Sequence, residues 1–158
     1  MWIFCGGMPR SGSTLQFHLT AHLVEHAGRG TRVEWVRPEE FPCLRDKYAE
    51  HDGWKVFKTH VCTAEVQAEF EALNAKGVYV FRDVRDVVVS RMRKGGQTFD
   101  RLWEGKFLDR LLTSFDRWTS LEAVSCRGTK RWWRTWPARS RGSPRISASR
   151  SVETSARR

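Results

Sequence analysis

Residues 7–15 read GMPRSGSTL and directly follow the apolar run WIFC. Two glycines separated by four residues, then Ser13 and Thr14, nearly match the phosphate-binding loop G-x-x-x-x-G-K-[ST]. Ser13 stands where that loop has its lysine, and a cation, Arg10, lies inside the loop instead. A short apolar run, a glycine turn and apolar residues at helical spacing predict a strand, a tight loop and a helix over Ser13–His26.

The residue types of this loop are suited to hold an anion. Gly12 lets the backbone approach a ligand, and the amides of Ser13 and Thr14 lie at a helix N-terminus, where the helix dipole favours negative charge. The hydroxyls, including that of Ser11, add donors, so we expect a phosphate or sulfate site. A nucleoside triphosphatase would use the missing lysine for its β- and γ-phosphates. A glycine–serine turn that only begins a helix is the alternative.

Strand and helix signals alternate along the first 125 residues, which favours an α/β domain with a mainly parallel sheet flanked by helices, like P-loop nucleotide-binding folds. The first helix has its apolar residues at Leu15, Leu19 and Leu23. The region 38–53 has two prolines and many charges and is interpreted as a loop with a helical turn or two. Strands are predicted at Trp2–Cys5, Arg32–Val36, Trp54–Lys58 and Val78–Phe81, and helices at Ser13–His26, Thr63–Ala75, Val84–Lys94 and 98–122.

Candidate site residues follow three of these strands, at the sheet edge where ligands of parallel α/β sheets bind. Arg10–Thr14 follow the first strand, and Lys58 and His60 end the third. His60 could act as a general base, and Lys58 could stabilise an oxyanion. Arg82 ends the fourth strand and could grip a phosphate, with Ser90 donating from the next helix. The alternatives are a surface or capping histidine and a surface ion-pair cluster around Arg82.

The net charge of +10 is concentrated at the C-terminal end, because residues 126–158 carry nine of those charges. Beyond alanine this segment has only Ile146 and Val152 as aliphatic residues, so we expect a basic, disordered tail after a domain at residues 1–125. Its tryptophans and arginines allow a second interpretation as a nucleic-acid-binding arm, which composition alone supports weakly.

Cysteines and histidines give no indication of a metal site or a disulfide framework. The four cysteines are scattered, without paired spacing, which favours a reduced, cytoplasmic setting. His18, His22 and His26 share one helix face, but no carboxylate or cysteine is placed beside them, so we assign no metal. The apolar start is far shorter than a membrane span, and no export signal precedes it.

Two of these motifs resemble those of sulfotransferases that use 3′-phosphoadenosine 5′-phosphosulfate (PAPS). PRSGSTL at residues 9–15 is similar to the family's 5′-phosphosulfate loop, and YVFRDVRDVVVS at 79–90 is similar to its 3′-phosphate motif. Lys58-Thr59-His60 resembles the segment with the catalytic histidine in the cytosolic branch. The resemblance implies PAPS as donor, bound through the loop, Arg82 and Ser90. It also implies His60 as base, with Lys58 and Arg10 stabilising charge.

The resemblance covers residues 2 to about 124 and then stops, so we expect the fold to be incomplete at the C-terminus. Two alternatives to a sulfotransferase remain: a P-loop kinase or nucleotide hydrolase with an aberrant loop, and an inactive nucleotide-binding fragment. The acceptor, a hydroxyl or amine on a small molecule, glycan or lipid, is left open. Residues 36–53 are expected to help shape its pocket.

Overall fold

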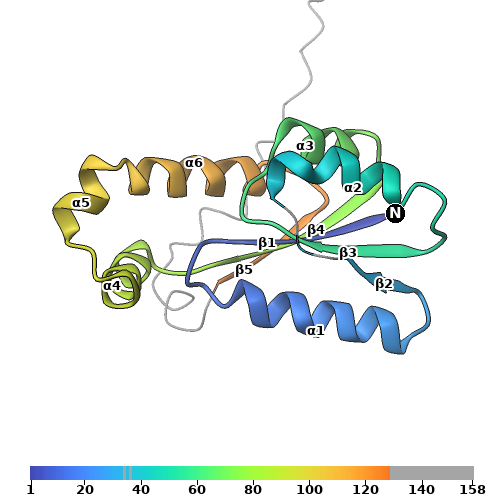
Figure 1. The fold of residues 1–158 in the computed structure, drawn as a ribbon, viewed down its shortest axis with the longest axis horizontal. Helices are drawn as coiled ribbons and strands as arrows, with labels where there is room; N and C mark the ends of the chain where they lie inside the picture. Colours follow the sequence, from blue (N-terminus) through green and yellow to red (C-terminus); the bar gives the residue numbers. More distant parts are fainter. Residues whose placement is uncertain (34, 36, 129–158) are drawn as a thin grey trace, which may run out of the picture.

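Five parallel strands form the centre of the computed structural model, which describes residues 1–33, 35 and 37–128 (Figure 1). Their order is β2-β3-β1-β4-β5, with β1 in the middle. The α/β class with a parallel sheet, predicted from the sequence, is therefore confirmed. The strands are β1 (Trp2–Gly7), β2 (Gly30–Arg32), β3 (Trp54–Lys58), β4 (Ala75–Phe81) and β5 (Val124–Gly128).

Helices cover the two faces of the sheet unequally (Figure 1). One face carries α1 (Ser13–His26), and the other carries α2 (Phe41–Lys47), α3 (Ala64–Glu71) and α6 (Phe107–Thr119). A short 3₁₀ helix, η1 (Pro38–Glu40), precedes α2. The remaining two, α4 (Val84–Gly95) and α5 (Phe99–Glu104), lie beyond the end of the sheet where β1 and β4 finish. This end also carries the candidate residues.

An aromatic core fills the space between the sheet and α2, α3 and α6. Trp118 of α6 is fully buried and stacks on Tyr79, with the ring centroids 5.8 Å apart. Gly6 provides room for this stack, because a Cβ there would lie 3.0 Å from both rings. Burial of such large rings is the main stabilising term of the fold. Other members of this core are Trp2, Phe4, Phe41, Phe57 and Phe70.

The first helix packs on the sheet with a different face from the one its leucines indicate. Leu15, Leu19 and Leu23 are 55–66% exposed, whereas Phe17 and Ala21 are buried against the sheet. The loop from β1 buries Ser13 at the first turn, which sets the rotation of the helix. Residues at 17, 21 and 24 then face the strands, so the predicted apolar face was wrong.

Several element boundaries also differ from the predicted ones. The second strand is Gly30–Arg32, earlier than the predicted Arg32–Val36, and β4 begins three residues earlier than expected, at Ala75. The helix predicted over 98–122 is two helices, because Gly105 ends α5 and Lys106 adopts a positive φ of 52°. Helix ends depend on such local backbone turns, which apolar periodicity does not report.

The sequence analysis missed β5, which pairs in parallel with β4 from Gly77↔Val124 to Phe81↔Gly128. The boundary expected between residues 125 and 126 falls inside this strand. Backbone pairing with β4 holds the strand, although most of its side chains are exposed. Of the tail expected to be disordered, residues 126–158, the first three belong to β5, and residues 129–158 lie outside the described residues.

Replacing Gly7 by alanine tests how tightly the end of β1 is packed. A Cβ there would lie 2.7 Å from Ser13 Cβ and 2.8 Å from the Val80 carbonyl oxygen. We expect Gly7→Ala to lower the free energy of unfolding by about 1–3 kcal/mol, as overpacking does, measured by urea denaturation. Gly95→Ala is the control, because its Cβ would meet nothing closer than 3.5 Å. Equal stability of Gly7→Ala and the parent would contradict this packing.

Candidate functional site

The loop between β1 and α1 is tied to β4 by hydrogen bonds. The buried Ser11 hydroxyl donates to Met8 O (2.6 Å) and lies 2.9 Å from Val80 O. The Met8 amide donates to the same Val80 oxygen at 2.9 Å. Ser11 therefore holds the loop in shape, and its proton is committed within the protein.

The outer side of this loop is open. Gly12 has a φ of 87°, and a Cβ there would meet nothing within 4 Å. The amides of Ser13 and Thr14 begin α1 and have no carbonyl one turn earlier within the helix. Ser13 is buried and Thr14 is exposed. Free amides, a positive helix end and an unobstructed backbone suit an anion.

Arg10 connects the loop to α4. Its Nε donates to the Ser90 hydroxyl at 3.1 Å, and its own φ is 66°, a conformation that few residues other than glycine adopt. Beside this contact lies an open groove of about 590 Å³. The charged residues that line the groove are four cations and one carboxylate: Arg10, Arg82, Arg93, Lys94 and Asp86.

Asp86 orients Arg82 in this groove. Nε and Nη2 of Arg82 donate to Asp86 Oδ2 at 3.2 and 3.1 Å, and both side chains are more than a third exposed. An ion pair so open to solvent contributes about 0–1 kcal/mol, so a ligand phosphate can compete for the guanidinium. The groove is therefore suited to an anion that carries more than one charge.

His60 is held by the carbonyl that ends β1. Its Nδ1 lies 2.6 Å from Gly7 O, and because a carbonyl only accepts, Nδ1 carries the hydrogen and Nε2 keeps a lone pair. Burial, with a smaller effect of the nearby Lys58 charge, lowers the His60 pKa below its usual range, although the bond to Gly7 opposes this. The neutral imidazole is thus favoured at neutral pH, as a general base requires.

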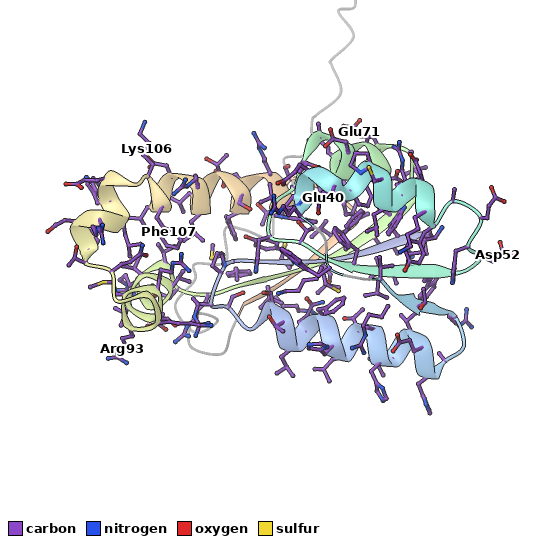
Figure 2. The ribbon with its side chains drawn as sticks, viewed as in Figure 1. Glu40, Asp52, Glu71, Arg93, Lys106 and Phe107 are labelled. Carbon is purple, nitrogen blue, oxygen red and sulfur yellow. The ribbon has the colours of Figure 1, made fainter. Side chains whose placement is uncertain are left out.

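A second cavity, of about 270 Å³, lies on the His60 side of the loop. Pro9 and His60 form part of its wall, and α6 contributes Phe107, Leu111 and Ser114. Figure 2 shows Phe107 on the side of α6 that faces α4. Pro9 borders this cavity and Arg10 borders the basic groove, so consecutive loop residues separate the two spaces.

The structure brings together most of the residues that the sequence singled out. Arg10, Arg82 and Ser90 line one groove, and Lys58 lies close enough to His60 to influence its pKa. Lys58 itself lines neither the basic groove nor the cavity beside His60.

Apart from Ser90, the sequence analysis did not identify as site residues the helix residues that line the groove and the cavity, or Tyr79 of β4. Arg93 and Lys94 follow Ser90 by three and four residues, a spacing that places all three on one helix face and was available as a signal. Phe107 and Leu111 lie within the helix predicted over 98–122, and only the fold shows that they line a cavity. Tyr79 was noted only as part of a motif.

The described residues contain no group of three or more metal-ligating side chains. His18 instead contacts Arg32, with Nδ1 and Nη1 3.2 Å apart, and the rings of His22 and His26 stack at 6.0 Å. Within the same residues no helix has the length and apolar character needed to cross a membrane.

Comparisons with known proteins place the chain in a family. No significant match was found among curated proteins. A solved structure described as "uncharacterized protein from Eubacterium ventriosum ATCC 27560" is 16% identical, covers 81% of this chain and 89% of its own, and has a TM-score of 0.44. A family model described as a sulfotransferase domain matches residues 3–140, and with most of its length matched the chain belongs to the sulfotransferase domain family.

Proposed function

We propose that this chain transfers a sulfuryl group from PAPS to a hydroxyl or amine acceptor. The observation that carries the proposal is the contact between Arg10 and Ser90, which joins the anion loop to a groove containing Arg82. On the other side of the same loop, His60 borders a separate cavity. A donor site and an acceptor site with a base between them are what group transfer needs.

The residues of the loop and groove fit the two charged ends of PAPS. The Gly12, Ser13 and Thr14 amides, with the Thr14 hydroxyl and Arg10, would hold the phosphosulfate, and Ser11 would keep the loop in shape. Arg82 and Ser90 would hold the 3′-phosphate, with Arg93 and Lys94 adding positive charge to the groove. When bound, PAPS supplies a sulfuryl group attached to a phosphate leaving group.

His60 would take the proton of the acceptor hydroxyl or amine at Nε2, while the hydrogen on Nδ1 stays bound to Gly7 O. As the acceptor forms its bond to sulfur, the bond between sulfur and the phosphate oxygen breaks, and 3′,5′-bisphosphoadenosine leaves. Arg10 and Lys58 would stabilise the charge that develops on the leaving phosphate and the transferring oxygens. Lys58 also favours the neutral form of His60.

Nucleotide preference tests this proposal directly. A ligand that binds only the folded state raises the melting temperature, so 3′,5′-bisphosphoadenosine should stabilise the chain more than ATP with Mg²⁺ does. A preference for ATP with Mg²⁺ would favour a kinase or nucleotide hydrolase instead. Binding of the bisphosphate without any sulfuryl transfer would favour the inactive nucleotide-binding fragment.

Substitutions of Arg82 and Ser90 should weaken binding of the 3′-phosphate and leave binding of the 5′-phosphate nearly unchanged. We expect Arg82→Ala to weaken binding of 3′,5′-bisphosphoadenosine by about 10-fold or more, because a charge-assisted hydrogen bond is lost. Ser90→Ala should have a smaller effect. Binding of 5′-AMP, which lacks the 3′-phosphate, should change little in both variants, as calorimetry can measure.

Arg85→Ala is the matched control for Arg82→Ala. Its guanidinium is highly exposed and pairs with Asp83, and it does not line the groove. The control should bind both nucleotides as the parent does. Equal losses for 5′-AMP and the bisphosphate in Arg82→Ala would contradict the assignment of Arg82 to the 3′-phosphate.

Loss of the base should affect turnover and spare binding. We expect His60→Ala to reduce kcat by about 10²–10⁴, the usual range for a general base, with nucleotide affinity retained. His26→Ala, on the exposed end of α1, is the control. Unchanged kcat in His60→Ala at saturating substrates would remove His60 from the mechanism.

The pH dependence should reveal the environment of His60. The neutral form is active, so kcat/KM should fall as the pH drops through the His60 pKa, which lies below its ordinary value of 6.5. Lys58→Gln removes a positive charge that lowers this pKa, so its acidic limb should move to higher pH. An acidic limb above pH 6.5 in the parent chain would contradict the described environment.

A further inference from the structure

His60 lies in a segment without regular secondary structure. Residues 59–63 connect β3 to α3 and form neither a helix nor a strand. The Thr59 hydroxyl closes a tight turn around His60, because it accepts from the Val61 amide at 3.1 Å and donates to Val61 O at 2.9 Å. A side chain on such a segment is placed less precisely than one on a helix or strand. A base there therefore needs contacts with the rigid elements around it.

Two hydrogen bonds connect His60 to such elements, from opposite directions. The first joins its Nδ1 to Gly7 O at the end of β1. The second comes from α6, where the Ser114 hydroxyl donates to the backbone carbonyl of His60 at 2.9 Å. A serine hydroxyl has one proton, so the proton of Ser114 is committed to His60. Both residues are half-buried, which limits the access of water that would compete for this bond.

Ser114 has a fixed place because of its position on α6. It lies three residues after Leu111, on the helix face that lines the cavity beside His60. Trp118 follows one turn later, is fully buried and stacks on Tyr79 of β4. This stack holds the same face of α6 against the sheet. Ser114 thus joins a helix anchored on the sheet to the backbone of the candidate base.

We infer that Ser114 is a positioning residue for His60, whose carbonyl it holds so that Nε2 meets the proton of the acceptor. This inference rests on the proposed function, because it takes His60 as the base. Ser114 acts only through His60 and touches no reacting atom. The base is then held between β1, through Gly7 O, and α6, through Ser114.

The protonation of His60 reports how firmly it is held. Burial is the main cause that lowers its pKa below the ordinary value of 6.5. The titratable groups that border His60 or its cavity come from β3, β4 and α6: Lys58, Tyr79 and Arg110. Replacing Ser114 by alanine alters the charge of none of them. A changed pKa of His60 in that variant therefore reports a change in its hydration.

An NMR titration of the free full chain tests the inference without any turnover, with His60→Gln to assign the signal among the five histidines. We expect Ser114→Ala to raise the His60 pKa toward its ordinary value. Water then replaces the lost hydroxyl at the His60 carbonyl and hydrates the ring. Thr119→Ala is the matched control, because the Thr119 hydroxyl donates to Phe115 O within α6, also at 2.9 Å. The control should titrate as the parent does.

Turnover should change in parallel. We expect Ser114→Ala to lower kcat by about 10-fold, less than the loss of the base itself, because the base is misplaced rather than absent. The affinity for 3′,5′-bisphosphoadenosine, measured by calorimetry, should stay unchanged. The acidic limb of kcat/KM should move to higher pH, in line with the raised His60 pKa. Ser114→Thr keeps the donor and should restore both kcat and the position of the limb.

The two measurements separate this inference from the proposed function. An unchanged His60 pKa in Ser114→Ala would overturn the inference, even if the melting temperature falls, because Ser114 would then serve only the packing of α6. Sulfuryl transfer that Ser114→Ala leaves at the parent rate would also overturn it and leave the proposed function standing. A parent chain without sulfuryl transfer would contradict the proposed function. A raised His60 pKa in Ser114→Ala would still support the placement of the imidazole by Ser114.

Discussion

The missing side chain at Gly7 lets three segments meet at the end of β1. The backbone of Gly7 lies against Ser13 of α1 and the Val80 carbonyl of β4, closer than any Cβ would allow. Its own carbonyl oxygen accepts the hydrogen of His60 Nδ1 at 2.6 Å. The loop, the neighbouring strand and the histidine are therefore fixed relative to one another by a single peptide unit. The distances from Ser11 to Val80 O and from His60 to Gly7 O therefore depend on this close approach.

The two spaces beside the loop differ in electrostatics. The groove with Arg10 and Arg82 gathers positive charge and holds one carboxylate, whereas the cavity with Phe107 is mainly apolar. Asp86 holds the Arg82 guanidinium in place through an ion pair that is open to water. A phosphate could therefore replace the Asp86 carboxylate at small cost in free energy. An anion and an apolar molecule would thus be sorted to opposite sides of Pro9 and Arg10.

Sequence reasoning was most successful where local signals and burial agree. β1, β3 and the loop that begins α1 were predicted because buried parallel strands are apolar runs and glycine marks the turn. The β5 strand was missed because Cys126 and Arg127 are exposed and it is held by backbone pairing with β4. The leucines of α1 gave a wrong prediction of its buried face. Their spacing identifies an apolar face, but it does not show which face of the helix meets the sheet.

The candidate site shows the same division. Arg10, His60 and Arg82 could be chosen because the carboxyl ends of parallel strands meet at one edge. Tyr79 could not be chosen from the sequence, because its place in the cavity wall depends on how α6 packs on β4 and on where Trp118 stacks. A residue inside a strand becomes part of a site only through tertiary packing. The long-range arrangement of α6, rather than any motif, therefore determines the chemistry of the apolar cavity.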